Sequence, residues 1–223
     1  MFFSANPARV IAGSFLGVII TGTLLLMLPL SAKNGAVTNF FDALFTATSA
    51  TCVTGLIVVD TYTHWTFFGQ GVILSLIQIG GLGLVTLTLF FNLLIRRKLG
   101  LRTLQLAQES TSASNFEDTP RLLRGIVGIS LTVEAIGAVL LLPAFVPKYG
   151  MEGIFISVFT SVSAFCNAGF DLLGREGPYS SLSHYNGSYV LIDLILCLAI
   201  LAILSKPMRK YLRGDDIKAL RGE

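Results

Sequence analysis

Charged residues are scarce in this chain of 223 residues. Asp, Glu, Lys and Arg make up 13% of it, whereas hydrophobic residues make up 53%. A soluble domain usually carries about 25% charged residues, so this chain has too few charges for water to surround it on every side. That shortage excludes a disordered chain, a coiled coil and a nucleic-acid binder, and the composition predicts an all-α integral membrane protein.

Cysteine and catalytic motifs are also sparse. Cys52, Cys166 and Cys197 are too few and too widely spaced for a disulfide framework or a zinc site. The sequence contains no glycine-rich phosphate loop, no catalytic dyad and no metal cluster. We therefore expect no enzyme, no cofactor and no resident metal.

Four long apolar runs stand out, and one bilayer crossing needs about 20 such residues. They cover residues 10–30, 69–95, 122–146 and 189–205. The second run stops at Arg96, and we expect Pro147 to end the third. Four crossings place both termini on the same side of the membrane.

The basic residues set the predicted orientation. Thirteen Lys and Arg residues lie on the side of the termini and of the 96–121 connection, and only Lys33, Lys148 and Arg175 lie on the other. Because positive charge marks the cytoplasmic side, we predict a multi-pass protein of the bacterial inner (plasma) membrane with both termini in the cytoplasm. We interpret the basic residues as a topology signal and not as a nucleic-acid binding patch. The expected surroundings of the chain are the lipid bilayer, and we expect no nucleic-acid partner.

Two shorter apolar segments, 39–50 and 152–164, do not fit a simple four-helix count. At about 1.5 Å per residue, each helix is too short to cross the bilayer, and a polar stretch with a glycine follows it. Irregular backbone at membrane depth is tolerated only inside protein or along a water-filled cavity. This pattern predicts re-entrant helices beside a pore.

An internal repeat supports this organisation. A shift of 114 positions aligns residues 41–56 with 155–170 and gives seven identities in 16 positions. The predicted fold is thus two parallel repeats of helix, pore loop and helix. The predicted domains are a first repeat, a cytoplasmic connector, a second repeat and a basic cytoplasmic tail, at 8–98, 99–120, 121–206 and 207–223.

The loops after the short helices carry small and hydroxyl residues with one glycine each. Glycine accepts positive φ and so turns successive carbonyl groups toward one axis, where a ring of carbonyl oxygens replaces the water around a cation such as K⁺. The C-terminal end of each short helix also favours a cation. The candidate ion-binding residues are Thr51, Cys52, Val53, Thr54, Gly55, Cys166, Asn167, Ala168, Gly169 and Phe170.

Hydroxyl groups on the short helices are candidates for holding freed backbone groups behind the loops. They belong to Thr46, Thr48, Ser49, Ser161 and Ser163. The alternative for the loops is that a helix-breaking glycine in an extracellular turn was simply duplicated.

These loops resemble the pore loops of a known transporter family. The stretches TATSATCVTGL at 46–56 and SVSAFCNAGFDLL at 161–173 are similar to the first two pore loops of the Trk/Ktr/HKT potassium transporter superfamily. IQIGGLGLVTL at 77–87 and LGLRTLQLAQES at 99–110 add to the resemblance. It implies four repeats around one pore, with Gly55 and Gly169 as filter glycines and Gly55 as the form that permits K⁺. It also implies that cytoplasmic regulatory subunits of the RCK type dock on the chain.

This chain has two of the four repeats that the resemblance implies. Two loops close half a ring, and half a coordination shell does not offset the dehydration of an ion. We therefore expect either a homodimer around one pore or a complementary half-transporter as partner, with K⁺ or Na⁺ as the transported ion. The alternative function is a truncated or non-conducting membrane subunit of a K⁺ uptake system.

Five further residues are candidates for supporting roles. Glu134 lies in the third apolar run, where an ionisable group is costly and usually functional, and it either supports a loop, faces the pore or stays protonated. Asp171 follows the second loop and either concentrates cations at the mouth or is only a solvated loop residue. Gly80, Gly81 and Gly83 form either a hinge or a close helix contact.

Overall fold

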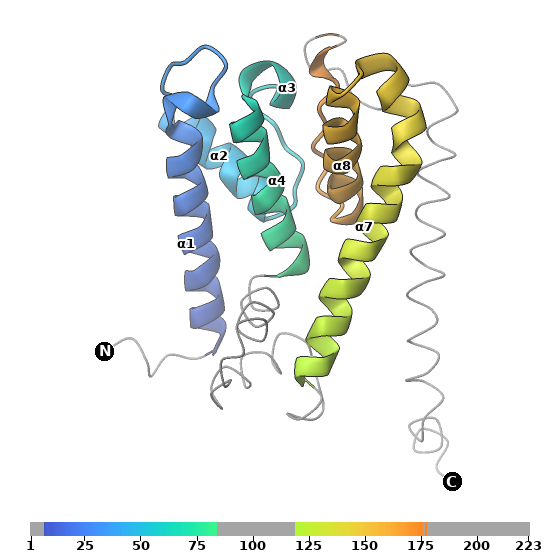
Figure 1. The fold of residues 1–223 in the computed structure, drawn as a ribbon. Helices are drawn as coiled ribbons and strands as arrows, with labels where there is room; N and C mark the ends of the chain where they lie inside the picture. The colour runs from blue at the N-terminus through green and yellow to red at the C-terminus, as the bar shows by residue number, and fades with distance from the viewer. Residues whose placement is uncertain (1–6, 84–118, 176, 178–223) are drawn as a thin grey trace. The chain divides into compact units, whose positions relative to one another are not determined.

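The computed structural model describes residues 7–83, 119–175 and 177, in which helices are joined by turns and irregular loops (Figure 1). Within them the backbone forms no strand beyond one isolated bridge between Ala32 and Trp65. The elements are α1 (Pro7–Met27), η1 (Pro29–Ser31), α2 (Phe40–Thr51), α3 (Thr61–His64), α4 (Phe67–Leu82), α7 (Thr119–Tyr149), α8 (Glu152–Phe165) and η2 (Leu173–Arg175).

The short helices α2 and α8 correspond to the two re-entrant segments expected at 39–50 and 152–164. Asn39 caps the N-terminus of α2. Its side chain accepts a hydrogen bond from the Phe41 N–H at 3.0 Å and so satisfies a backbone donor that has no partner within the helix. Each helix lies beside longer helices in the fold (Figure 1). Contacts join α2 to α1 and α4, and α8 to α7 and α4.

Helix α4 ends earlier than its apolar sequence predicts. The run at 69–95 was expected to form one helix, but α4 stops at Leu82. The reason is Gly83, whose φ of 79° leaves the helical region in a conformation that glycine adopts without a Cβ clash. Residues 84–95 of that run lie outside the described residues.

Helix α7 continues past the proline that was expected to end it. It runs to Tyr149 with Pro143 and Pro147 inside it, so the prediction that Pro147 closes the third run is wrong. Because Pro147 lacks an N–H, its cost is one missing backbone hydrogen bond. The N–H of Gly150 still donates to the Val146 carbonyl at 2.8 Å, and the helix ends where Gly150 takes a φ of 63°.

Among the described residues, the part of α7 at Val127–Tyr149 is long and apolar enough to cross a membrane. The apolar parts of α1 and α4, Ile11–Met27 and Phe67–Leu82, are shorter. The fourth run at 189–205, the connector at 99–120 and the tail at 207–223 lie outside the described residues. The multi-pass topology and the cytoplasmic termini therefore stay predictions.

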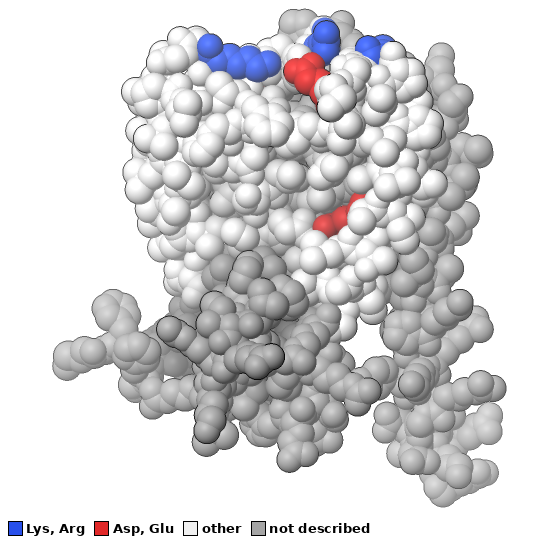
Figure 2. All heavy atoms as spheres, viewed as in Figure 1, with Lys and Arg blue, Asp and Glu red and all other residues white. Residues whose placement is uncertain are grey.

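The described surface has few charges. Figure 2 shows charged atoms gathered along the upper edge of this face, and one acidic group lower down among uncharged residues. Large apolar side chains are exposed on the long helices, among them Leu16 and Leu24 of α1 and Val139 of α7. Since soluble monomers rarely expose apolar patches of this kind, this surface suits lipid.

Candidate functional site

The two loops after α2 and α8 have the same backbone conformation. Val53 and Asn167 both have a φ of 57°, and Gly55 and Gly169 have φ values of 73° and 71°. These pairs are separated by 114 positions, as in the repeat found in the sequence. The repeated sequence therefore folds into repeated backbone geometry.

The hydrogen bonds of the loops repeat in the same register. In the first loop the N–H groups of residues 52, 53 and 54 donate to the carbonyl oxygens of Thr48, Ala50 and Ser49 at 2.8, 3.3 and 3.0 Å. The N–H groups of residues 166, 167 and 168 do the same toward the end of α8, at 2.9, 3.0 and 2.7 Å. In a trans peptide the carbonyl points opposite to the N–H. The carbonyl groups of residues 52 and 53, and of 166 and 167, are therefore directed away from the helix ends.

The glycines of the two loops lie against each other. A Cβ built on Gly55 would be 2.7 Å from the Ala168 carbonyl oxygen and 3.2 Å from the Gly169 Cα. A Cβ built on Gly169 would likewise be 3.2 Å from the Gly55 Cα. The two loops meet here: a side chain on Gly55 would clash with the backbone of the second loop, and one on Gly169 would be tight against Gly55.

Hydroxyl groups anchor both loops from behind. The hydroxyls of Ser49 and Thr54 are hydrogen-bonded at 2.9 Å in the first loop. In the second loop, where position 168 is an alanine, the Ser163 hydroxyl donates to the Phe170 carbonyl at 2.5 Å. The backbone support expected of Ser163 is therefore present, whereas Ser49 bonds the side-chain hydroxyl of Thr54 and not a backbone group.

The remaining hydroxyl groups do not support the loops as expected. Thr46 and Thr48 donate to the carbonyls of Asp42 and Leu44, four residues earlier in their own helix, which is a common arrangement for threonine in helices. Ser161 donates to the Glu134 carbonyl of α7 at 2.7 Å.

The end of α4 lies directly behind both loops. A Cβ on Gly80 would collide with the Thr51 carbonyl oxygen, and a Cβ on Gly81 would collide with the Cys166 sulfur. Thr51 is buried, and its carbonyl lies against α4. Gly80 and Gly81 therefore allow close packing, and the hinge suggested for Gly80, Gly81 and Gly83 stays a prediction.

Glu134 lies in α7 with its side chain 6% exposed. Gln78 of α4 donates from its amide nitrogen to both carboxylate oxygens of Glu134, at 2.9 and 3.1 Å. Sequence reasoning singled out Glu134 but missed Gln78. The signal was present, because a buried polar side chain in an apolar helix needs a partner.

The other candidate residues lie at or near the glycine contact with differing exposure. Cys52, Thr54 and Asn167 are exposed, whereas Ala168 and Phe170 are buried. Val53 and Cys166 are half-buried.

Two carboxylates lie beyond the loops. Asp60 is buried at the start of α3, where its Oδ1 accepts from the N–H groups of Tyr62 and Thr63, and it lies against Gly174. Burial raises the pKa of Asp171; the Leu173 N–H opposes this rise, and the charge of Asp60 adds to it. Asp171 is thus less readily ionised than an ordinary aspartate.

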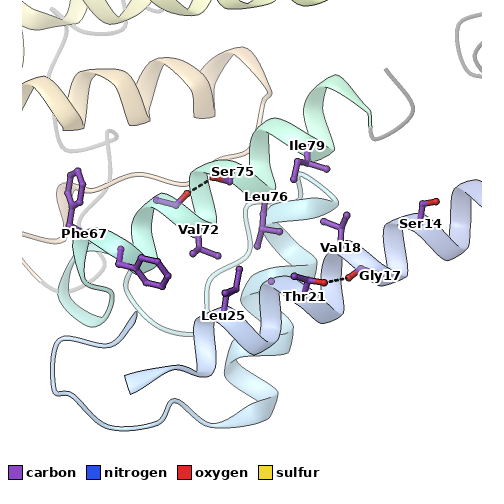
Figure 3. Close-up of a pocket in the computed structure, with 13 residues that line it drawn as sticks. Ser14, Gly17, Val18, Thr21, Leu25, Phe67, Val72, Ser75, Leu76 and Ile79 are labelled. Atoms are coloured by element: carbon purple, nitrogen blue, oxygen red, sulfur yellow. Dashed lines mark hydrogen bonds between the residues drawn. The ribbon is translucent and has the colours of Figure 1, made fainter. Parts of the chain in front are cut away.

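A separate groove lies between α1 and α4 (Figure 3). Its volume is about 740 Å³, and none of its lining residues belongs to either loop. Thr21 and Ser75 on its walls donate to the carbonyls of Gly17 and Gly71 in their own helices. With these hydroxyls satisfied the groove is apolar, and it is distinct from the loop site.

Comparison with known proteins adds a family and several relatives. The family profile TrkH, described as cation transport protein, matches residues 4–204. The potassium/sodium uptake protein NtpJ of Enterococcus hirae is 41% identical over 170 residues, which are 76% of this chain and 38% of that protein. The Ktr system potassium uptake protein B of Bacillus subtilis is 44% identical over 75% of this chain and 37% of that protein. Its counterpart from Vibrio alginolyticus is 44% identical over 74% and 36%. The chain thus spans less than two fifths of the length of these relatives.

Proposed function

The chain belongs to the TrkH family of cation transport proteins, and we propose that it moves a monovalent cation, K⁺ foremost, across the bacterial plasma membrane. The path runs past the two loops, where backbone carbonyl groups take the place of water around the ion. Named relatives are potassium or potassium/sodium uptake proteins, which supports K⁺ or Na⁺ as the transported ion.

The observation that carries this proposal is the contact between two equivalent glycine loops. Both loops have the same pattern of positive φ, and their glycines lie so close that a Cβ on Gly55 would clash with the Ala168 carbonyl oxygen and one on Gly169 would be tight against the Gly55 Cα. Both follow the C-terminal end of a helix of at least 12 residues, whose partial negative charge favours a cation. The proposed ligands are the carbonyl oxygens around Gly55 and Gly169.

Two loops supply half of a ring, so the proposal includes a partner that supplies the rest. A second copy of the chain in a homodimer is one source, and a complementary half-transporter is the other. A cytoplasmic regulatory subunit of the RCK type is a further proposed partner. Mass measurement in detergent separates a homodimer from a monomer.

Uptake measurements in bacteria that lack their own potassium uptake test the function. We expect the wild-type chain to restore growth at low K⁺ and to take up Rb⁺. G55D and G169D should abolish uptake, because each puts a side chain into the loop contact and a carboxylate beside the carbonyl groups.

Gly35 provides a matched control for these variants. It also has a positive φ, of 66°, but a Cβ there would meet nothing within 4 Å. G35D therefore introduces the same side chain on a similar backbone outside the loops, and it should retain uptake. A wild-type chain that inserts into the membrane and takes up no Rb⁺ would contradict a homodimer that conducts by itself. If uptake is also absent when a second half-transporter is expressed with it, the result favours a non-conducting subunit.

A further inference from the structure

Gln78 and Glu134 connect the two repeats behind the loops. Gln78 belongs to α4, which follows the first loop, and Glu134 belongs to α7, which precedes the second. The amide nitrogen of Gln78 donates to both oxygens of Glu134 at 2.9 and 3.1 Å, and Glu134 is buried. A buried carboxylate shared with a single amide donor is costly to break, because either group alone stays unsatisfied.

The end of α4 connects the pair to both loops. Gln78 is two residues before Gly80 and three before Gly81, which lie against the Thr51 carbonyl and the Cys166 sulfur. On a helix, positions three apart lie on the same face, so Gln78 shares a face with Gly81, which contacts the second loop. Gly80, two positions after Gln78, contacts the first loop from another side of α4. Holding Gln78 against α7 therefore fixes how the end of α4 presents its glycines to the loops.

The pair also reaches the second loop through α8. The backbone carbonyl of Glu134 accepts the Ser161 hydroxyl at 2.7 Å. Two residues further along α8, Ser163 holds the Phe170 carbonyl next to Gly169. Glu134 thus joins α4 by its side chain and α8 by its backbone.

We propose that Gln78 and Glu134 are positioning residues that set the register between the two loops, and through it the discrimination between K⁺ and Na⁺. This inference rests on the proposed function, since discrimination has meaning only if the loops conduct. The role requires the hydrogen bond between the two side chains and does not require the charge of Glu134. The carboxylate is a tie between helices, placed behind the ion path.

The test uses variants that separate hydrogen bonding from charge. E134Q keeps an oxygen that accepts from Gln78 and removes the charge, whereas E134L and Q78L each break the bond. T132V is the control, because Thr132 is exposed on α7 and donates only within its own helix, to Gly128. Na⁺ competition with Rb⁺ uptake measures the discrimination between the two ions. Thermal unfolding in detergent measures what the hydrogen bond contributes to stability, independently of transport.

We expect E134L and Q78L each to lower K⁺ over Na⁺ discrimination by up to roughly tenfold, about the weight of one hydrogen bond. E134Q should retain most of the discrimination, and T132V all of it. In the unfolding experiment, the double variant Q78L/E134L should lose less stability than the two single variants lose together, because residues in direct contact have coupled effects on stability.

Three results would overturn the proposal. They are unchanged discrimination in E134L, equal losses in E134Q and E134L, and additive losses in the unfolding experiment. A wild-type chain without Rb⁺ uptake, both alone and with a second half-transporter, overturns the proposed function and the selectivity role with it. In that case the comparison of the single and double variants in unfolding still shows whether the hydrogen bond between Gln78 and Glu134 holds α4 and α7 together.

Discussion

Replacing Gly80 with alanine tests whether the close approach of α4 holds the first loop in place. A Cβ at this position collides with the Thr51 carbonyl oxygen, which is backbone and cannot rotate aside as a flexible side chain can. Either α4 or the loop must move. Gly71 offers a control in the same helix, since a Cβ there meets nothing within 4 Å.

The size of the effect follows from two opposing terms. Alanine gains about 0.5–1 kcal/mol over glycine inside a helix, and G71A should show only this gain. Overpacking a filled site costs about 1–3 kcal/mol, so G80A should lose between about 0 and 2.5 kcal/mol after the same gain is subtracted. The two variants therefore differ by the collision alone, about 1–3 kcal/mol.

Unfolding in detergent measures this difference, and Rb⁺ uptake measures its consequence at the loop. We expect G80A to unfold at a lower temperature than G71A and to lose uptake or discrimination, whereas G71A should keep both. G81A should behave like G80A because its Cβ meets the Cβ of Cys166 at 2.8 Å as well as its sulfur, and rotation of the sulfur does not move the Cys166 Cβ. If G80A is as stable and as selective as G71A, the end of α4 does not position the loop.

Two further predictions concern the second loop and the residue beyond it. S163A should reduce stability by about 1–3 kcal/mol, because the buried Phe170 carbonyl loses its donor, while S157A, which removes a bond within α8, should cost less in the same unfolding assay. D171N should be more stable than wild type at pH 7 and equal to it in strong acid. Because burial, with help from Asp60, raises the pKa of Asp171, the folded protein binds this proton more tightly than the unfolded chain. Stability then falls as the pH rises through the window above the ordinary aspartate value of 3.8, and thermal unfolding across pH checks whether D171N removes that slope.

The short helices were predictable because their sequence is both apolar and repeated. The segments 39–50 and 152–164 became α2 at Phe40–Thr51 and α8 at Glu152–Phe165. The matching glycines at 55 and 169 also marked where the backbone takes positive φ. Local residue type determines these features, so they can be recognised without the rest of the fold.

Features that depend on contacts between distant segments were harder to predict. Hydropathy continues through Gly83 and therefore gave no sign that α4 ends at Leu82. Pro147 is a strong breaker in isolation, but α7 accommodates it inside a packed helix. Gln78 attracts notice only when Glu134 is placed beside it, and no sequence spacing relates residues 56 positions apart.

The partners of the hydroxyl groups were the least predictable part of the site. Ser49 and Ser163 occupy equivalent repeat positions, but their partners differ because residue 54 is a threonine and residue 168 an alanine. A repeat in sequence thus fixes the path of the backbone more firmly than it fixes the side-chain bonds around it.

Val53 and Asn167 share a φ of 57°, but this conformation differs in energetic cost between the two loops. Asparagine visits the left-handed region with little penalty, whereas a β-branched valine is forced into it at a cost of about 1–2 kcal/mol. The backbone of the first loop is therefore strained at Val53, whereas the backbone of the second loop is not strained at Asn167. Position 53 is therefore a natural first choice for engineering a more stable form of this chain. Any stability gained there would measure the conformational energy that the shape of this turn costs the protein.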